Sequence, residues 1–469
     1  MLARHLPGVA VFLAAAPWSQ AEVRTVGPDD QLFDFTSIQD ALDASQDGDL
    51  IRVAPGDYEP FLIVDKAVSV LGSGSDLTRI QAQTLPSVEG PRWMTSIYAW
   101  GVDAGPIAIG GFSVEPGIEG TFEGCYGVYL DDSTEAIQLF DIEVTVDRPI
   151  VAKKHSRLGV FTQSGAANCS FSDCHTRYVG DIAPWSMDAP EDFKGVAGFA
   201  LDGGEAWLSG CTLEGSRGPQ CGDSSHSIYL FPVDPAGPGI QQFSGDLTLA
   251  DCVLIGADGN PEGPCDPGLA APGFLRTAEI WDDGATRIHD GPNNRIQGGS
   301  APYAPAAAMY YSAPVEPEMS AFVKLIPGID ESGLIAYESL FFTEEAPVIH
   351  ADHRPVLAVQ PGIVELGSQV EVQVHADPNA VSLVFWSGQP LAAPSLATPT
   401  LSGVDGPLLL SPLAAHLLPI LVHDGKGTGA LSVDLPFEPT LLEVWITLQA
   451  FEVDATGITA TPAVALATR

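Results

Sequence analysis

One short pattern recurs three times in this chain and limits its fold more than any other sequence feature. An apolar strand, an acidic or glycine-containing turn and a second apolar strand follow one another over residues 127–144 and 198–213. A third copy reads Ile-Tyr-Leu at 228–230 and, after an interruption, Leu-Thr-Leu-Ala-Asp-Cys-Val-Leu at 247–254. Units of this size cannot bury their own apolar face, so they must stack on one another. The chain is therefore predicted to form a β-solenoid.

Successive turns of the predicted solenoid can be aligned through pairs of apolar residues two positions apart, which point to one side of a strand. The pairs are Phe112/Val114, Ile142/Val144, Cys169/Phe171, Cys211/Leu213 and Cys252/Leu254. The later pairs are spaced more widely than the roughly 20 residues of a β-helix turn, which predicts insertions at 172–197 and 217–246. Insertions that leave neighbouring turns at one corner would flank a binding groove.

Residues 34–74 predict how the solenoid begins. Thr36 or Ser37 can cap a helix with apolar positions Ile38, Ala41 and Leu42, and the strand Leu50–Val53 follows. This order resembles the N-terminal cap and first turns of secreted right-handed parallel β-helix proteins of the pectin-lyase fold. The resemblance implies an all-β chain whose N-terminal helix covers the open end of a right-handed parallel β-helix.

Four parts of the chain are predicted from composition and strand pattern. They are a signal peptide at 1–21, a parallel β-helix at 22–300, a linker or packed connecting segment at 301–354 and a small C-terminal β-sandwich at 355–469. The last part resembles a β module seen on secreted bacterial proteins. The predicted signal peptide implies a secreted or cell-envelope protein. No later apolar run reaches the length of a membrane span.

The chain is strongly acidic, with 60 Asp and Glu against 20 Lys and Arg and a net charge of −40 at pH 7. Nucleic acids and anionic membranes need a basic surface, so neither is an expected partner. The resemblance to secreted β-helix proteins instead implies a polysaccharide or a cell-surface glycan as the partner.

Seven cysteines are compatible with disulfides in an exported protein. They are Cys125, Cys169, Cys174, Cys211, Cys221, Cys252 and Cys265. Cys169, Cys211 and Cys252 fall at matching apolar positions, which fits either a buried ladder of thiols or disulfides between turns. Cys174, Cys221 and Cys265 are expected in the insertions, where they can form further disulfides.

A basic segment of ten residues, 148–157, which we call the basic decade, stands out in this acidic chain. It contains Arg148, Lys153, Lys154, His155 and Arg157, and Arg177 follows one turn later. Such side chains could hold an acidic polysaccharide or remove a proton beside a uronate, as β-helix lyases do. The alternative is that they pair with neighbouring acids.

Aspartates follow equivalent strands at Asp131, Asp132, Asp202 and Asp282. Stacked carboxylates could bind calcium, the one cofactor considered, or act as acid and base in glycoside hydrolysis. Aspartate is also a common turn residue, and the signature motifs of polygalacturonases, pectin methylesterases and pectate lyases do not occur. Trp185, Tyr178 and Tyr229 are candidate platforms for sugar rings.

These observations favour a secreted β-helix protein that engages carbohydrate. Two alternatives remain: a polysaccharide lyase or glycoside hydrolase that acts on an acidic polysaccharide, and a non-catalytic surface scaffold or adhesin. The fold cannot decide between them, because β-helices host all of these functions.

Overall fold

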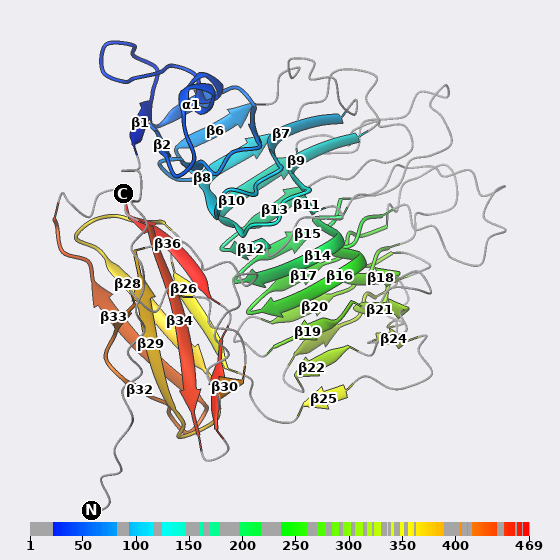
Figure 1. Ribbon diagram of the computed structural model, residues 1–469. Coiled ribbons are helices and arrows are strands. Elements are labelled where there is room, and N and C mark those ends of the chain that lie inside the picture. The colour runs from blue at the N-terminus through cyan, green and yellow to red at the C-terminus, as the bar shows by residue number, and fades with distance from the viewer. Residues whose placement is uncertain are drawn as a thin grey trace, which may run out of the picture.

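The computed structural model is all-β, with a right-handed parallel β-helix followed by a smaller β-sandwich (Figure 1). It describes residues 22–81, 93–115, 124–146, 160–162, 169–178, 197–216, 236–259, 270–277, 284–289, 294–301, 305–312, 317–320, 323–329, 335, 339–341, 348–350, 355–360, 363–388, 404–405, 410, 415–438, 445–454, 457–461 and 463–468. Within these ranges, no helix has the length and apolar composition that crossing a bilayer requires.

The coil is one 25-stranded sheet that winds about 330° around an axis, and its parallel ladders define three sides. Sheet I contains β1 (Val23–Val26), β2 (Leu50–Val53), β5 (Ser69–Leu71), the first halves of β8 (Ile107–Glu115) and β10 (Ile137–Val146), β12 (Cys169–Ser172), the second halves of β14 (Phe199–Ser209) and β16 (Ile240–Ala250), β19 (Thr286–Ile288), β22 (Glu318–Ser320) and β25 (Val348–His350).

Sheets II and III complete each turn. Sheet II contains β3 (Gly56–Tyr58), β6 (Thr78–Gln81), the second halves of β8 and β10, β13 (His175–Tyr178), β15 (Thr212–Glu214), β17 (Val253–Ile255), β20 (Arg295–Gln297) and β23 (Lys324–Ile326). Sheet III contains β4 (Phe61–Val64), β7 (Trp93–Trp100), β9 (Gly124–Asp131), β11 (Val160–Thr162), the first halves of β14 and β16, β18 (Phe274–Thr277), β21 (Met309–Ser312) and β24 (Ser339–Phe341).

The N-terminal helix α1 (Ile38–Ala44) forms as predicted. The Ser37 side chain caps it by accepting a hydrogen bond from the Asp40 backbone N–H. Ile38, Ala41 and Leu42 are buried in the same core as the first strands of the coil. The helix therefore covers the end of the apolar interior that the first turn would otherwise expose to water.

Sheets I and II meet at a one-residue corner. Gly111, Asp141, Asp173, Gly210 and Asp251 occupy matching positions there, and all five have a positive φ between 47° and 76°. Glycine adopts this left-handed conformation freely, and aspartate is among the few other residues that tolerate it. Asp141, Asp173 and Asp251 therefore shape this corner of the coil.

Three parts of the predicted alignment are wrong. The ladder of thiols joins Cys174, Cys211 and Cys252, whereas Cys169 lies on sheet I opposite Ile137. Cys174 is thus in the core and not in an insertion, and Cys169, Cys174, Cys211 and Cys252 are all buried free thiols. The strand equivalent to Phe199–Leu201 is Ile240–Gln242, not residues 228–230, which lie outside the described ranges.

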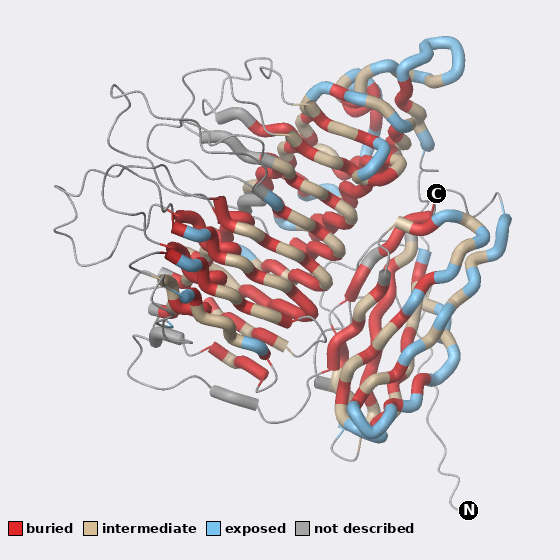
Figure 2. Tube along the Cα trace, turned by 180° about the vertical axis from the view of Figure 1, so that it is seen from behind, coloured by how far each residue is buried: buried red, intermediate tan, exposed pale blue. Residues whose placement is uncertain are grey.

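The coil also continues past its predicted end near residue 300. Strands β21 to β25 add turns as far as His350, so the predicted linker at 301–354 contains coil strands. Buried positions run through every turn of the coil, whereas exposed ones gather around the N-terminal turns and on the outer strands of the sandwich (Figure 2).

The C-terminal part has the predicted two-sheet arrangement. One sheet contains β26 (Val356–Gln360), β28 (Gln369–His375) and β33 (Thr428–Asp434). The other contains β27 (Ile363–Val364), β29 (Val381–Ser387), β30 (Val404–Asp405), β31 (His416–Leu417), β32 (Leu421–Val422), β34 (Trp445–Val453), β35 (Ile458–Ala460) and β36 (Val464–Thr468). Alternate residues of these strands face one another in a shared apolar core.

Candidate functional site

Two of the predicted aspartates lie in one outward-facing row on sheet III. Leu130 pairs with Thr162 and Thr162 with Leu201, so Asp131 and Asp202 occupy the same position two turns apart. At about 4.8 Å per turn, their Cα atoms are about 10 Å apart, too far for the two alone to form a compact calcium site. The neighbouring Asp132 has φ of 43° and is exposed, which fits the alternative reading as a turn residue.

A β-bulge separates Asp202 from the next outward acid on the same strand. The register of β14 against β16 shifts on both sides of Asp202, where Gly203 and Gly204 have φ of 98° and 72°. Beyond the bulge, Glu205 pairs directly with Asp246 of β16. In-register side chains of parallel strands point the same way, so the two carboxylates lie side by side on adjacent turns.

Glu205 sits in an environment that favours its protonated form. Its Oε1 accepts a hydrogen bond of 2.9 Å from the Trp207 indole N–H. Burial raises the pKa of Glu205, the indole lowers it, the Asp246 carboxylate raises it and Arg287 lowers it, with a net upward shift. Glu205 can therefore hold a proton at a pH where an ordinary glutamate has lost it.

Asp246 has a different environment. Its Oδ1 accepts a hydrogen bond of 2.6 Å from the Ala285 backbone N–H on the following turn. This backbone donor occupies one oxygen of the Asp246 carboxyl group, whereas the partner of Glu205 is a side-chain indole. Two adjacent carboxyl groups in unlike surroundings are the arrangement from which acid and base roles arise.

We call the group formed by Asp202, Glu205, Trp207 and Asp246 the carboxylate corner, because it lies where sheet III turns into sheet I. All four side chains are half-buried, so they are open to solvent without being fully hydrated. Asp202 also accepts a hydrogen bond of 3.2 Å from Ser244 Oγ. The corner supplies a proton-holding acid, a second carboxylate and an aromatic ring within a few residues.

Of these four residues, only Asp202 is predicted from the sequence. Glu205 and Asp246 are missed because their pairing depends on the register of two strands separated by 40 residues. A signal for it exists: Glu205 follows a Gly-Gly and Asp246 follows a Ser-Gly, each ahead of an apolar strand that ends in a cysteine turn. Aligning these turns on Ala206 and Leu247 would have matched the two acids.

The predicted Arg177 lies elsewhere, on the outer face of sheet II. Its Nη2 is 3.8 Å from Glu143 Oε1, and His175 Nε2 on the same strand is 3.2 Å from Asp173 Oδ1. Hydrogen bonding to Asp173 raises the pKa of His175. Arg177 therefore pairs with an acid, as the alternative reading expected, and the described residues do not bring it into one groove with Asp131 and Asp202.

The remaining predicted site residues lie outside the described ranges. They are Arg148, Lys153, Lys154, His155, Arg157, Trp185, Tyr229 and Asp282. Tyr178 is the last residue of β13, and the placement of its side chain is not described.

A group of acids that the sequence did not reveal lies in the sandwich. Ligand oxygens of Asp377, Glu452 and Asp454 lie within 4.8 Å of one another, the one such cluster of three or more in the described residues. Glu452 is buried, and its Oε1 accepts a hydrogen bond of 2.8 Å from the Asp377 N–H. Carboxylate oxygens are ligands suited to calcium, so these residues could hold that ion.

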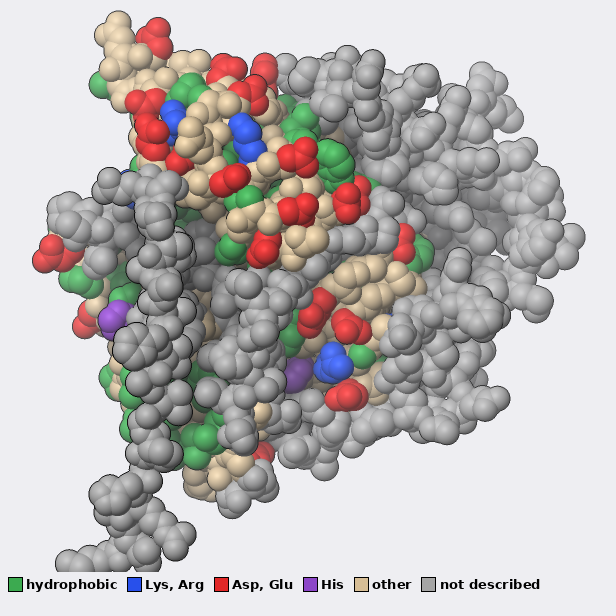
Figure 3. All heavy atoms as spheres, viewed as in Figure 1, with side chains coloured by type: hydrophobic (Ala, Val, Ile, Leu, Met, Phe, Trp, Pro, Cys, Tyr) green, Lys and Arg blue, Asp and Glu red, His purple; other side chains and the backbone are tan. Residues whose placement is uncertain are grey.

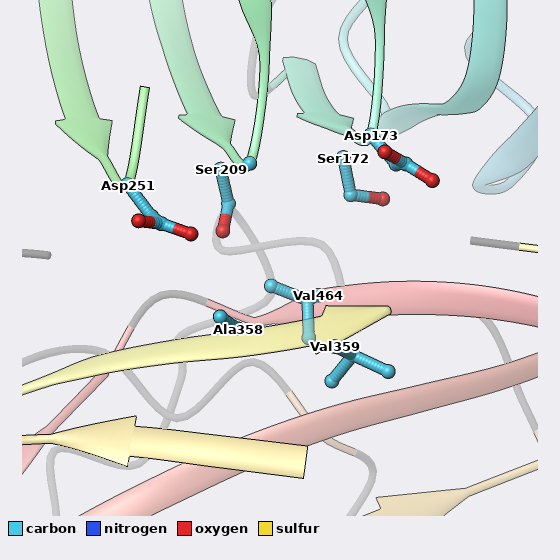
Figure 4. Close-up of a pocket in the computed structure, with 8 residues that line it drawn as sticks. Ser172, Asp173, Ser209, Asp251, Ala358, Val359 and Val464 are labelled. Atoms are coloured by element: carbon cyan, nitrogen blue, oxygen red, sulfur yellow. The ribbon is translucent and has the colours of Figure 1, made fainter. Parts of the chain in front are cut away.

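The sandwich packs against the outer face of sheet I beside the corner with sheet II. A small cavity between the two is lined by the residues drawn in Figure 4: Ser172, Asp173, Ser209, Gly210, Asp251, Ala358, Val359 and Val464. Its volume of about 10 Å³ is roughly what one water molecule needs and far too small for a sugar ring. The cavity is a gap in an internal interface, and the carboxylate corner stays the better candidate site.

We compared the sequence with protein families and with curated proteins. The sequence matches no protein family and no curated protein.

Proposed function

We propose that this protein is a secreted or cell-envelope β-helix protein that binds a glycan along the outside of the coil and hydrolyses it at the carboxylate corner. The pairing of Glu205 with Asp246 on adjacent turns, beside Trp207, is the observation that supports this proposal most directly. Parallel-coil architecture and the N-terminal cap also agree with a relationship to proteins of the pectin-lyase fold.

Each residue has a distinct role in the proposed reaction. Glu205, whose pKa is raised, is the general acid that protonates the glycosidic oxygen as the bond to the anomeric carbon breaks. Asp246 stabilises the positive charge that develops on the sugar ring or activates the attacking water. Trp207 offers an aromatic face for a sugar ring, and the outward row with Asp202 and Asp131 continues the surface along the coil.

We propose hydrolysis because the Glu205–Asp246 pair supplies the two carboxyl groups that this reaction uses. Arg177, the candidate lyase base within the described ranges, lies on sheet II, 3.8 Å from Glu143. The non-catalytic scaffold differs from the hydrolase in one measurable way, since it would bind glycans and release no product.

The test is release of reducing ends from a broad panel of polysaccharides by wild-type protein, Glu205→Gln and Asp246→Asn. Each variant is expected to lose at least about 100-fold in kcat, because general acid–base catalysis contributes about 10² to 10⁴. Retained binding of oligosaccharides would show that the fold and surface are intact.

Glu214→Gln is a matched control. Burial raises the pKa of Glu214 as well, but this residue lies on sheet II, away from the corner. Its substitution should leave the rate within about twofold. Wild-type binding without product from any glycan would establish the scaffold function, and unchanged rates in both corner variants would place catalysis elsewhere.

A further inference from the structure

The charges described around the carboxylate corner are strongly one-sided. Asp131, Asp202, Glu205 and Asp246 lie along the outward positions of sheet III and the start of sheet I. Arg287, one turn beyond Asp246 on sheet I, is the described cation whose charge lowers the pKa of Glu205. Over the N-terminal turns, too, acidic side chains dominate the described surface (Figure 3).

From this charge distribution we propose that the corner accepts only non-anionic glycans, neutral or amine-bearing, and excludes uronate-containing and sulfated chains. The proposal rests on the function proposed above and replaces the acidic substrate that the basic decade suggested. A sugar carboxylate held about 4 Å from one of these acids would be repelled by about 1 kcal/mol in bulk water and by more at a half-buried site. The overall charge of −40 opposes the approach of any polyanion.

A buried hydroxyl beside the corner also points to a hydrogen-bonding ligand. Thr248 lies two residues after Asp246 on β16 and faces the same way, in register between Trp207 and Arg287. It is 1% exposed, and its Oγ1 has no hydrogen-bond partner among the described residues. An unsatisfied buried hydroxyl is costly, and a sugar hydroxyl can both donate and accept the missing hydrogen bond.

The test compares three oligosaccharide sets of equal length: N-acetylglucosamine (neutral), glucosamine (cationic) and galacturonate (anionic). Dissociation constants for the full chain and for Glu205→Gln are measured by calorimetry at pH 7.5 in low and high salt. The galacturonate oligomer is expected to bind at least about tenfold more weakly than the better of the other two, and the gap should narrow in high salt as charges are screened.

The double substitution Asp131→Asn with Asp202→Asn should shrink that gap, whereas Asp434→Asn on the sandwich should leave it unchanged. Asp434 is exposed and is a suitable control for a general change in charge. Galacturonate binding that equals or exceeds the other two would overturn the charge selectivity while leaving the proposed function intact. Absence of binding by all three sets, together with no product from any polysaccharide of the panel, would contradict the proposed function itself and this inference with it.

Discussion

Aspartate has several distinct roles in this chain, and local geometry separates them. Asp132, Asp141, Asp173 and Asp251 have positive φ and shape corners of the coil. Asp246 instead lies in a strand beside another carboxyl group. Composition and turn propensity treat these residues alike, because both depend on residue type alone.

Asp141 is the corner residue whose titration is most readily measured. Its carboxylate accepts hydrogen bonds of 2.9 and 2.8 Å from the backbone N–H and hydroxyl of Ser75. Burial nevertheless raises its pKa to about 6, and the charges of Asp173 and Asp76 act in the same direction. The folded protein therefore binds this proton more tightly than the unfolded chain does.

This raised pKa predicts how Asp141→Asn changes stability with pH. The contribution of the protonated carboxyl is fully present below about pH 4 and is lost as the pH rises through about 6. Asparagine keeps the shape, tolerates positive φ and carries no charge to bury. The variant should exceed the wild type by about 3 kcal/mol in unfolding free energy at pH 7.5 and match it near pH 4.

Chemical denaturation at the two pH values measures the difference, with Asp434→Asn as the control for an exposed carboxylate. An equal stability difference at both pH values would show that Asp141 does not carry a shifted proton in the folded state.

Among the structural elements, the cap helix was predicted correctly, whereas the alignment of the strands that meet at the corner was not. The helix α1 follows from apolar residues at helical spacing and from a capping serine, which are local signals. The alignment of Cys169 with Cys211 fails because inward and outward side chains alternate in the same way on sheet I and sheet II strands. Only the position of the left-handed Asp173 between them shows that Cys174, not Cys169, matches Cys211.

The cap predicts a large cost for Leu42→Ala. Leu42 is 2% exposed and fills the end of the coil core, so its loss leaves a cavity next to the first turn. The unfolding free energy should fall by about 2 to 4 kcal/mol. Asp43→Ala, on the exposed side of the same helix, should change it by less than about 0.5 kcal/mol. Equal effects of the two substitutions in a thermal melt would show that α1 does not seal the core.

In the whole molecule, the sandwich rests on the outer face of sheet I. Phe140 and Ala108 of the coil form one buried apolar cluster with Ala467 of β36, and Ile363 packs against it. Ser209 Oγ donates a hydrogen bond of 3.4 Å to the Leu357 carbonyl. Ser209 is two residues after Trp207 on the same face of β14, so the sandwich stands beside the carboxylate corner.

Phe140→Ala should loosen this docking and leave the coil folded. The lost contacts face the sandwich, so a protease is expected to release the C-terminal module at least about tenfold faster than from the wild type. Phe171→Ala is the matched control, because Phe171 points into the coil core and its loss should lower the melting temperature of the coil instead. Unchanged cleavage of Phe140→Ala would show that the cluster does not hold the two parts together.

The sequence alone determines that this chain is a β-solenoid with a helical cap and a C-terminal β module, because apolar alternation, turn residues and capping act over a few positions. It also determines where aspartates recur. The tertiary structure decides which residues become neighbours. Turns stack about 4.8 Å apart, and the register between them depends on the length of every corner and insertion along the way. That register places Glu205 beside Asp246, moves Arg177 to another sheet and aligns Cys174 with Cys211. The candidate site is therefore a property of how the turns stack, which no single turn of the sequence contains.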